Sequence, residues 1–182
     1  MTSFRVSGGH TLRGEIQPQG AKNEALQIIC ATLLTPETVL VNNIPDILDV
    51  NNLIDLVHSL GVKVTRHSRN SCSFSADNIN IEYLLTEDFK KRSASLRGSL
   101  MIMGPLLARF GKAYIPRPGG DKIGRRRMDT HINGLVSLGA SFDYDFNEEF
   151  YKLYAEKLNG CPMLLEEASV TGTANILMAA VL

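Results

Sequence analysis

Lysine, arginine and glycine residues occur together at several places where the chain could bind an anion. The first is GAKNE, residues 20–24, where Lys22 and Asn23 stand at the expected start of a helix. A helix start presents free backbone N–H groups and partial positive charge, so a lysine there can complete an anion site. The same residues also fit a solvated lysine beside an ordinary asparagine cap, and this stretch alone favours that second interpretation.

The second place is PGGDKIGRRRMD, residues 118–129, which combines a glycine-rich turn with three consecutive arginines. The arginines are Arg125, Arg126 and Arg127, and they precede an expected helix start near Asp129. An arginine run is usually a solvated face, but guanidinium groups beside the backbone amides of a glycine-flanked loop favour phosphate. We therefore interpret this loop as a phosphate-binding segment.

Asp121 lies in the same glycine-rich turn and fits two roles. It can be a turn residue, since aspartate is common in turns. It can also be a proton donor, but an ordinary pKa of about 3.9 leaves little of the acid form at neutral pH, and nearby arginines lower that pKa further. A bound anionic substrate that neutralised the arginines and excluded water would reverse this effect. The residue types alone favour the turn.

Three further groups stand at expected helix starts or among apolar residues. Arg97, in SLRGSL, needs a paired anion in such surroundings, and a structural carboxylate or a ligand would supply it equally well. His131 follows the arginine run, and a lone histidine of this kind is more often structural than catalytic. Residues 169–173, SVTGT, resemble a polar helix cap, which can also hold phosphate through hydroxyl and N–H groups.

Composition and charge argue against several classes of protein. The 19 lysine and arginine residues balance 19 acidic ones, so no net charge attracts nucleic acid or an anionic membrane. The first residues lack the pattern of a signal peptide, and no apolar run approaches the roughly 20 residues of a membrane span. The three cysteines have no metal-type spacing, which predicts reduced thiols and no metal site. We expect a cytoplasmic protein without a cofactor.

An internal repeat places the charged groups at comparable positions. Helical spacing of apolar residues predicts a first helix in each of three copies, over residues 23–34, 95–110 and 173–182. Pro105 should kink or interrupt the middle one. In two copies a short strand, a proline-containing loop and a second helix ending in glycine follow, and then a β-like segment. The strands are expected at residues 38–41 and 113–115, and the glycine caps at Gly61 and Gly139.

The repeat predicts an α/β fold built from helix–strand units. The first helix of each copy is apolar nearly all round, so we expect it at the centre of the domain, whereas the second has a polar face. The third copy stops within its first helix, in an apolar run without a cap, so we expect a fragment or completion by another chain. Residues 1–20 contain β-like runs and are expected to belong to, or bridge to, a second domain. Residues 21–182 then form the repeated domain, incomplete at its C-terminus.

Four motifs in this order resemble those of the enolpyruvyl transferase family: GAKNEAL, RGSLMIMGPLLARFG, PGGDKIGRRRMDTHINGL and SVTGTANILMAA. The resemblance covers essentially the whole chain and is strongest to the bacterial branch that uses UDP-N-acetylglucosamine as acceptor. It implies an inverse α/β, barrel-like domain with core helices and a truncated third repeat. It also implies a complete protein much longer than this chain.

The resemblance implies transfer of the enolpyruvyl group of phosphoenolpyruvate to the 3-hydroxyl of UDP-N-acetylglucosamine, the first committed step of peptidoglycan synthesis. Such chemistry needs an acid for the methylene carbon, a base for the sugar hydroxyl and cations for two anionic substrates. The implied acid is Asp121. The residues implied to contact phosphoenolpyruvate are Lys22, Asn23 and Arg126. Those implied to contact the nucleotide sugar are Arg97, Arg126, Arg127, Asp129, His131, Ser169 and Val170.

Three residues depart from the family pattern. Asp121 stands where the family usually has a cysteine, and Arg127 stands where a proline is common. Glu167 stands where many members have a lysine facing the diphosphate, which puts that contact in doubt. A carboxylate is a poorer nucleophile than a thiol for the epoxide of the antibiotic fosfomycin, so the first departure implies resistance to covalent inactivation.

Two other interpretations stay open. One is the sister enzyme 3-phosphoshikimate 1-carboxyvinyltransferase, against which the loop at residues 118–135 argues. The other is a non-catalytic protein that binds a nucleotide sugar on the same scaffold. The family's general base and several arginines lie beyond residue 182, so we expect the chain alone to be inactive. The central expectation is that Lys22, Arg97 and Arg126 converge on one cleft for negatively charged metabolites.

Overall fold

The computed structural model describes residues 3–117 and 128–182. The helices are α1 (Lys22–Ala31), α2 (Leu48–Ser59), α3 (Glu87–Ala94), α4 (Met103–Phe110), α5 (Asp129–Ser137) and α6 (Val170–Ala180). Three short 3-10 segments are η1 (Thr32–Leu34), η2 (Ile81–Leu85) and η3 (Arg97–Ile102). The strands are β1 (Thr38–Val41), β2 (Lys63–Ser68), β3 (Ser71–Ser75), β4 (Lys112–Pro116), β5 (Ser141–Asp145) and β6 (Phe150–Tyr154).

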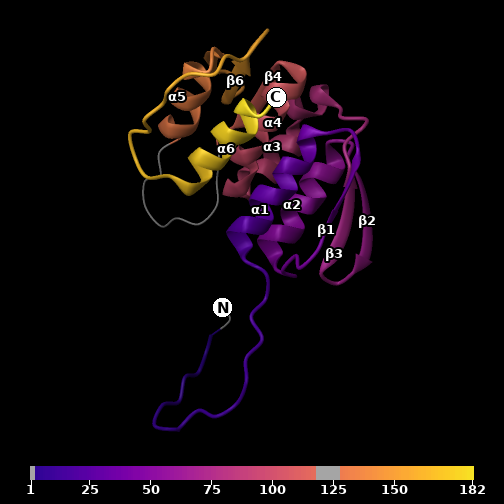
Figure 1. Ribbon diagram of the computed structural model, residues 1–182, viewed down its shortest axis with the longest axis vertical. Helices are drawn as coiled ribbons and strands as arrows, with labels where there is room; N and C mark the ends of the chain where they lie inside the picture. Colours follow the sequence, from indigo (N-terminus) through magenta and orange to yellow (C-terminus); the bar gives the residue numbers. More distant parts are fainter. Residues whose placement is uncertain (1–2, 118–127) are drawn as a thin grey trace.

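The two sheets have the same topology, which confirms the predicted repeat. Their strand orders are β1-β3-β2 and β4-β6-β5, and each central strand is antiparallel to both neighbours. In each of the first two copies, a first helix leads to an edge strand and a second helix leads to the strand at the opposite edge. That strand forms a hairpin with the next one, which lies at the centre of the sheet. Figure 1 shows the first sheet at the right-hand edge of the domain, with α1, α4 and α6 near its middle. The fold is therefore α/β with core helices, as predicted.

Helix ends in the two copies match in their backbone conformation. Gly61, after α2, has φ 107°, and Gly139, after α5, has φ 105°. Both values lie in the left-handed region, which only glycine adopts without strain, so the predicted caps are confirmed.

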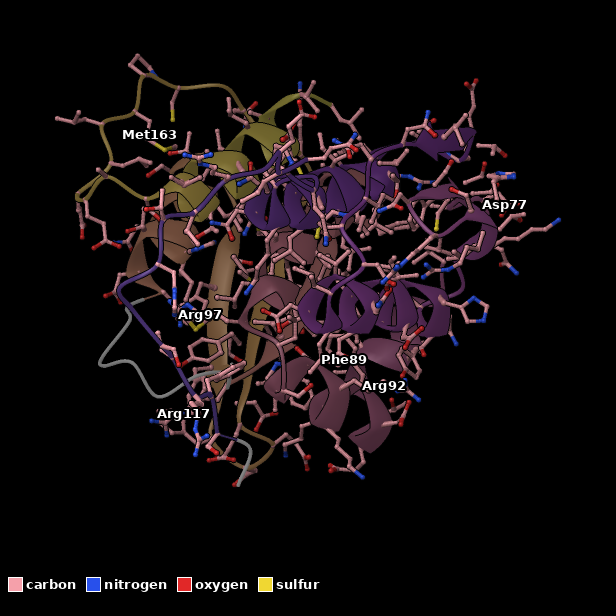
Figure 2. All side chains as sticks on the ribbon, turned by 90° about the horizontal axis from the view of Figure 1, so that it is seen from below. Asp77, Phe89, Arg92, Arg97, Arg117 and Met163 are labelled. Atoms are coloured by element: carbon pink, nitrogen blue, oxygen red, sulfur yellow. The ribbon has the colours of Figure 1, made fainter. Side chains whose placement is uncertain are left out.

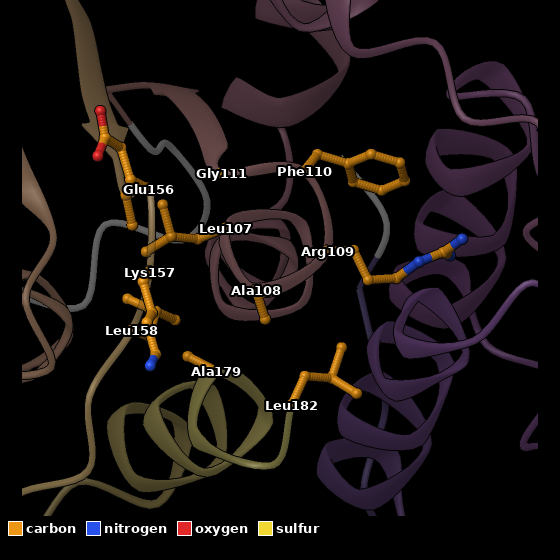
Figure 3. A pocket seen from close by; sticks show the side chains of 11 residues that line it. Leu107, Ala108, Arg109, Phe110, Gly111, Glu156, Lys157, Leu158, Ala179 and Leu182 are labelled. Carbon is orange, nitrogen blue, oxygen red and sulfur yellow. The ribbon is translucent and has the colours of Figure 1, made fainter.

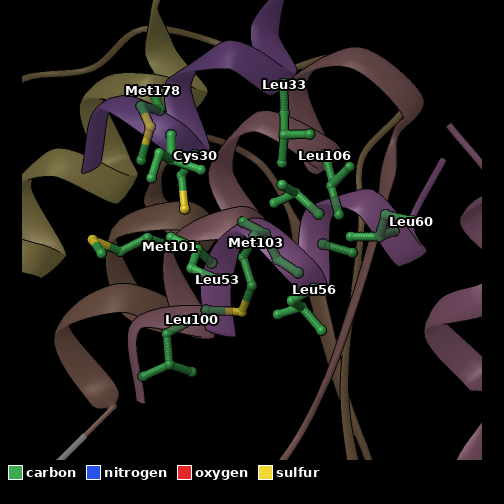
Figure 4. Packing of buried hydrophobic residues seen from close by; sticks show 14 of the residues in the cluster. Cys30, Leu33, Leu53, Leu56, Leu60, Leu100, Met101, Met103, Leu106 and Met178 are labelled. Atoms are coloured by element: carbon green, nitrogen blue, oxygen red, sulfur yellow. The ribbon is translucent and has the colours of Figure 1, made fainter. Parts of the chain in front are cut away.

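Side chains from the first helix of every copy meet in the core. Cys30 and Leu33 come from α1 and η1, Met103 and Leu106 from α4, and Met178 from α6 (Figure 4). Leu53, Leu56 and Leu60 close the same cluster from α2 and the residue after it, and all three are at most 1% exposed. Each leucine buried in this way stabilises the fold by about 1.5–3 kcal/mol. The apolar character of these helices is thus explained by their central position.

The helix predicted over residues 95–110 is interrupted before Met103, two residues before Pro105. The structure has η3 up to Ile102 and α4 from Met103, so Pro105 occupies the first turn of α4, where its missing N–H is tolerated. The interruption coincides with the side-chain amide of Asn175 from α6. Its Nδ2 donates to Leu100 O at 3.1 Å, and its Oδ1 accepts from Gly104 N at 2.7 Å. The amide therefore stands between a carbonyl and an N–H four residues apart, which would bond to each other in a regular helix.

Close contact at Gly104 lets α6 lie directly against α4. A Cβ atom built there would be 2.2 Å from the backbone oxygen of Asn175 and 2.7 Å from its Oδ1. The first atom is backbone and the second is held by the hydrogen bonds of the Asn175 amide, so a larger residue would push the two helices apart.

Arg109, in the last turn of α4, joins the second copy to two parts of the first. Its Nη1 donates to Leu33 O, within η1, at 2.8 Å and to Ala76 O, directly after the strand β3, at 3.0 Å. Two carbonyls that would otherwise lie unpaired near the core are satisfied by one guanidinium nitrogen.

Several elements differ from the sequence predictions. The first predicted helix, residues 23–34, is split into α1 and η1, and the last begins at Val170 rather than residue 173 because Ser169 caps it. α3, β3 and β6 were not predicted. The β-like runs at residues 4–6 and 12–16 form no strands, because within residues 3–117 and 128–182 no strand pairs with them, and Phe4 and Ile16 are 96% and 93% exposed. Pairing with a second domain stays a prediction.

Replacing Gly104 with alanine should destabilise the domain by about 1–3 kcal/mol or more, because the new methyl group would overlap the backbone of α6. Chemical denaturation measures the effect. Gly160→Ala is the matched control, since a Cβ there meets nothing within 4 Å and its φ is not in the left-handed region. Equal midpoints for both variants would contradict the packing described.

Candidate functional site

The start of α1 carries Lys22 and Asn23. The residue before the helix is Ala21, which makes no side-chain cap, so Asn23 lies inside the first turn rather than capping it. Gly20 lets the chain enter the helix tightly, since a Cβ there would be 1.9 Å from Asn43 O. Lys22 forms an ion pair with Asp49 of α2, and both side chains are partly exposed. An anionic ligand at this lysine would therefore share it with, or replace, a carboxylate of the protein.

Arg97 begins η3 beside α1. The next residue, Gly98, packs so closely that a Cβ there would be 3.2 Å from Leu26 Cδ1, in the second turn of α1. Arg97 is half-buried and is labelled in Figure 2, which shows the domain from below. Its positive charge acts on the imidazole of His131, which shows that the start of η3 lies near the start of α5.

The starts of α5 and α6 lie side by side. A Cβ at Gly172, in the first turn of α6, would be 3.0 Å from Cγ2 of Thr130, the second residue of α5. Ser169 Oγ accepts from Gly172 N at 3.1 Å and caps α6, which confirms the predicted polar cap. Val170 is 70% exposed, so the first residue of α6 faces away from the core.

Two glutamates in the segment before α6 form hydrogen bonds with side chains of α5. Glu167 Oε1 accepts from Thr130 Oγ1 at 3.2 Å, and Glu166 Oε1 accepts from Asn133 Nδ2 at 3.0 Å. Glu167 is one of the residues that depart from the family pattern in the sequence. In the structure its carboxylate holds a hydroxyl of the protein, so this position contributes a negative charge beside the two helix starts.

His131 is buried between these elements, with 3% of its surface exposed. Its Nδ1 lies 3.1 Å from Asn175 Nδ2 and its Nε2 lies 3.4 Å from Thr171 Oγ1. Burial and, to a lesser extent, the charge of Arg97 lower the pKa of the imidazole, the carboxylate of Glu167 partly opposes both, and the resulting pKa is about 4. His131 is therefore neutral at physiological pH and adds no positive charge to the site.

Asp129 is the first residue of α5 and is half-buried. A carboxylate in the first turn is favourable with the partial positive charge of the helix start. The charge of Asp129 also helps to raise the pKa of Tyr151 on β6, after the larger effect of burial. Asp121, Arg126 and Arg127 lie outside the described residues.

The structure thus brings some predicted site residues together and leaves others untested. Arg97, His131, Ser169 and Val170 belong to three neighbouring element starts, and α1 with Lys22 packs against the first of these. Sequence reasoning missed Asp49 and Asn175. The position of Asn175 as a lone polar residue in the apolar run TANILMAA was a signal for its role. No local sequence pattern indicated that Asp49 pairs with Lys22. The convergence of Lys22 and Arg97 with Arg126 on one cleft stays a prediction.

A separate cavity of about 420 Å³ lies at the C-terminal end of α4 (Figure 3). None of the residues that line it is a predicted site residue. Leu107, Leu158 and Leu182 contribute to its apolar wall. Within residues 3–117 and 128–182, no three histidine, cysteine or acidic residues are grouped to hold a metal ion, and no helix is long and apolar enough to cross a membrane.

Comparison with known proteins identifies the family of this chain. A sequence profile described as EPSP synthase (3-phosphoshikimate 1-carboxyvinyltransferase) matches residues 6–182. The chain belongs to this family. Among curated members, UDP-N-acetylglucosamine 1-carboxyvinyltransferases from Bacteroides fragilis and Porphyromonas gingivalis are 63% and 61% identical to it over all 182 residues. The chain spans only 42% of the length of each of these relatives.

Solved structures of an enolpyruvyl transferase and of an EPSP synthase share the fold. The enolpyruvyl transferase NikO from Streptomyces tendae aligns with 94% of this chain and 39% of its own, with a TM-score of 0.69 and 16% identity. An EPSP synthase from Acinetobacter baumannii aligns with 91% of this chain and 37% of its own, with a TM-score of 0.66 and 15% identity. Such low identities support the fold alone.

The lowered pKa of His131 predicts a loss of stability in acid. The folded chain binds a proton at this imidazole near pH 4, whereas the unfolded chain does so near the ordinary 6.5. Between these values the unfolded state binds more protons, so this contribution is fully present above pH 6.5 and is lost as the pH falls to about 4. The free energy of unfolding should decrease by on the order of 3 kcal/mol over this window.

Urea denaturation between pH 4 and 7 measures this dependence. His131→Asn should flatten the curve over the window, whereas His10→Gln, at an exposed histidine, should leave it unchanged. Parallel curves for the wild type and His131→Asn would show that His131 is not held neutral by the fold.

Proposed function

We propose that this chain is part of an enzyme that transfers the enolpyruvyl group of phosphoenolpyruvate to the 3-hydroxyl of UDP-N-acetylglucosamine. The observation that carries the proposal is identity of 61–63% over the whole chain to relatives named for that reaction. The enzyme would act in the cytoplasm at the first committed step of peptidoglycan synthesis. It would thereby serve cell-wall biogenesis, cell shape, the cell cycle and cell division.

The geometry of the described residues supports this chemistry. Both substrates are anions, and the starts of α5 and α6 present backbone N–H groups and partial positive charge on the same side, next to Arg97. The cap of α6 already uses Ser169 Oγ as an acceptor for Gly172 N. Ser169 and Val170 then offer backbone N–H groups to a diphosphate, whereas Lys22 and Asn23 on α1 are suited to phosphoenolpyruvate.

The reaction proceeds by addition and elimination. The 3-hydroxyl of the sugar loses its proton to a base while its oxygen bonds to C2 of phosphoenolpyruvate and an acid adds a proton to the methylene carbon C3. Loss of a proton from C3 and of phosphate from C2 then restores the double bond. Asp121 is proposed as the acid, Arg126 as a contact to both substrates, and Arg127 and Asp129 as nucleotide contacts. His131 is buried and neutral in the structure, so its part in the site is to position neighbouring groups.

The sister activity on shikimate 3-phosphate is the second candidate, because the matching family profile carries that description. The solved EPSP synthase is only 15% identical to the chain, however, whereas the relatives with the other acceptor exceed 60%. We therefore favour the nucleotide sugar. A non-catalytic nucleotide-sugar binder would bind the same ligand without turnover, so an assay of turnover separates it from both enzymes.

The full-length protein should release phosphate from phosphoenolpyruvate with UDP-N-acetylglucosamine and not with shikimate 3-phosphate. Lys22→Ala should lower kcat/KM for phosphoenolpyruvate by about tenfold or more, through loss of a charge-assisted contact. Lys63→Ala, at an exposed lysine on β2, is the matched control and should behave as the wild type. The 182-residue chain alone should be inactive. Turnover with shikimate 3-phosphate, or by the isolated chain, would contradict the proposal.

Asp121 should make the full-length enzyme resistant to fosfomycin, because a carboxylate attacks the epoxide far more slowly than a thiolate. Incubation followed by intact-protein mass spectrometry should detect no adduct on the wild type. Asp121→Cys should gain one adduct of the drug's mass and lose activity in parallel. Rapid labelling of the wild type at Asp121 would show that this reasoning is wrong.

A further inference from the structure

The side-chain amide of Asn175 has only one orientation that satisfies its neighbours. Gly104 N is a donor and lies 2.7 Å from the Asn175 oxygen, whereas Leu100 O is an acceptor and lies 3.1 Å from the Asn175 nitrogen. Exchanging the two amide atoms would place donor against donor and acceptor against acceptor. Both backbone contacts are buried, so that exchange would leave two polar pairs unsatisfied.

This orientation fixes the protonation of His131. Asn175 Nδ2 carries two hydrogens, of which one goes to Leu100 O and the other points at His131 Nδ1, 3.1 Å away. Nδ1 must then accept, so the imidazole is neutral and its single proton is on Nε2. A protonated imidazole would direct an N–H at an N–H, and the nearby charge of Arg97 also disfavours that form.

The Nε2–H group faces the hydroxyl of Thr171, at a long hydrogen-bond distance of 3.4 Å. Thr171 Oγ1 therefore acts as acceptor, and its own hydrogen must point elsewhere. Among residues 3–117 and 128–182, no acceptor for that hydrogen is found, and the side chain is only half-buried. Thr171 is the second residue of α6, between the Ser169 cap and the first full turn.

We propose that His131, set by Asn175, is a positioning residue that holds the Thr171 hydroxyl as a donor toward an anionic oxygen of a ligand at the start of α6. The proposal rests on the proposed function, in which that ligand is the diphosphate of UDP-N-acetylglucosamine. A hydroxyl free to rotate must be ordered when the ligand binds, whereas a hydroxyl that already accepts from Nε2 has its hydrogen directed in advance.

Three elements place charged groups near the Asn175–His131–Thr171 network. Arg97 approaches from η3 and Glu167 from the segment before α6, while Asp129 lies two residues away on α5. Arg97 and Glu167 act on His131 in opposite directions, and burial, the largest influence, keeps the imidazole neutral. The donor role of Thr171 should consequently persist down to mildly acidic pH.

The state of His131 is measured first, without any ligand. Long-range ¹H–¹⁵N spectra of the full-length protein with ¹⁵N-labelled histidine report which ring nitrogen carries the proton, and His131→Asn identifies the signal by its absence. We expect a neutral ring protonated at Nε2 from pH 7 down to pH 5. A ring protonated at Nδ1, or a charged ring at pH 6, would overturn the proposal.

The link to the ligand is measured by calorimetry with UDP-N-acetylglucosamine. Thr171→Val removes the hydroxyl at nearly constant volume and should weaken binding about tenfold, whereas Thr65→Val, at an exposed threonine on β2, should not. His131→Asn should weaken binding similarly, and His131→Gln, whose amide nitrogen can reach the position of Nε2, should restore part of it. Denaturation midpoints of all variants show whether each is folded.

A double variant separates positioning from general support of the fold. If His131 acts through Thr171, His131→Asn combined with Thr171→Val should bind no more weakly than Thr171→Val alone. Independent, multiplicative losses would overturn the proposal, as would wild-type affinity for Thr171→Val, and the proposed function would stand in both cases. If the wild-type protein does not bind the nucleotide sugar, the proposed function fails and this proposal fails with it.

Discussion

The insertion of one side-chain amide into the backbone of the middle helix is the interaction on which this arrangement depends. Asn175 satisfies a carbonyl and an N–H that would otherwise pair with each other, and it does so from a helix of the next repeat. The break between η3 and α4 follows from this contact. So does the close approach of α6, and with it the placement of α6 beside α5 and of Arg97 at the start of η3.

The chemistry available at the site is governed by which groups stay charged. His131 would be the most obvious additional cation, but its burial and the nearby Arg97 keep it neutral. Glu167 adds a negative charge at the position where the family pattern predicts a lysine. Within residues 3–117 and 128–182, positive character near the helix starts comes from Arg97 and from the helix ends themselves, and Lys22 on α1 pairs with Asp49. Among these described residues, neutral hydrogen-bonding groups form a larger part of the site than the sequence alone indicated.

Local signals predicted much of the fold, and long-range contacts accounted for most of the errors. The repeat, the glycine caps and the Ser169 cap follow from apolar spacing and from residue types within a few positions, which the sequence displays directly. α3 is short and strongly polar, and β3 and β6 are central strands whose partners lie elsewhere in the chain, so no local pattern distinguished them. The partner of Lys22 could not be chosen among 19 acidic residues, because charge type carries no information on position. The role of Asn175 likewise depends on partners 44 to 75 residues away.

The contact between Gly104 and Asn175 joins residues 71 positions apart in successive repeats. While the polypeptide is being made, the second repeat emerges from the ribosome before the residue that completes its central helix exists. Until the third repeat arrives, the Leu100 carbonyl and the Gly104 N–H lack their final partners, and a nascent chain can bond them only to each other or to water. The contacts of α6 with Leu100 and Gly104 can therefore form only after the third repeat has been made.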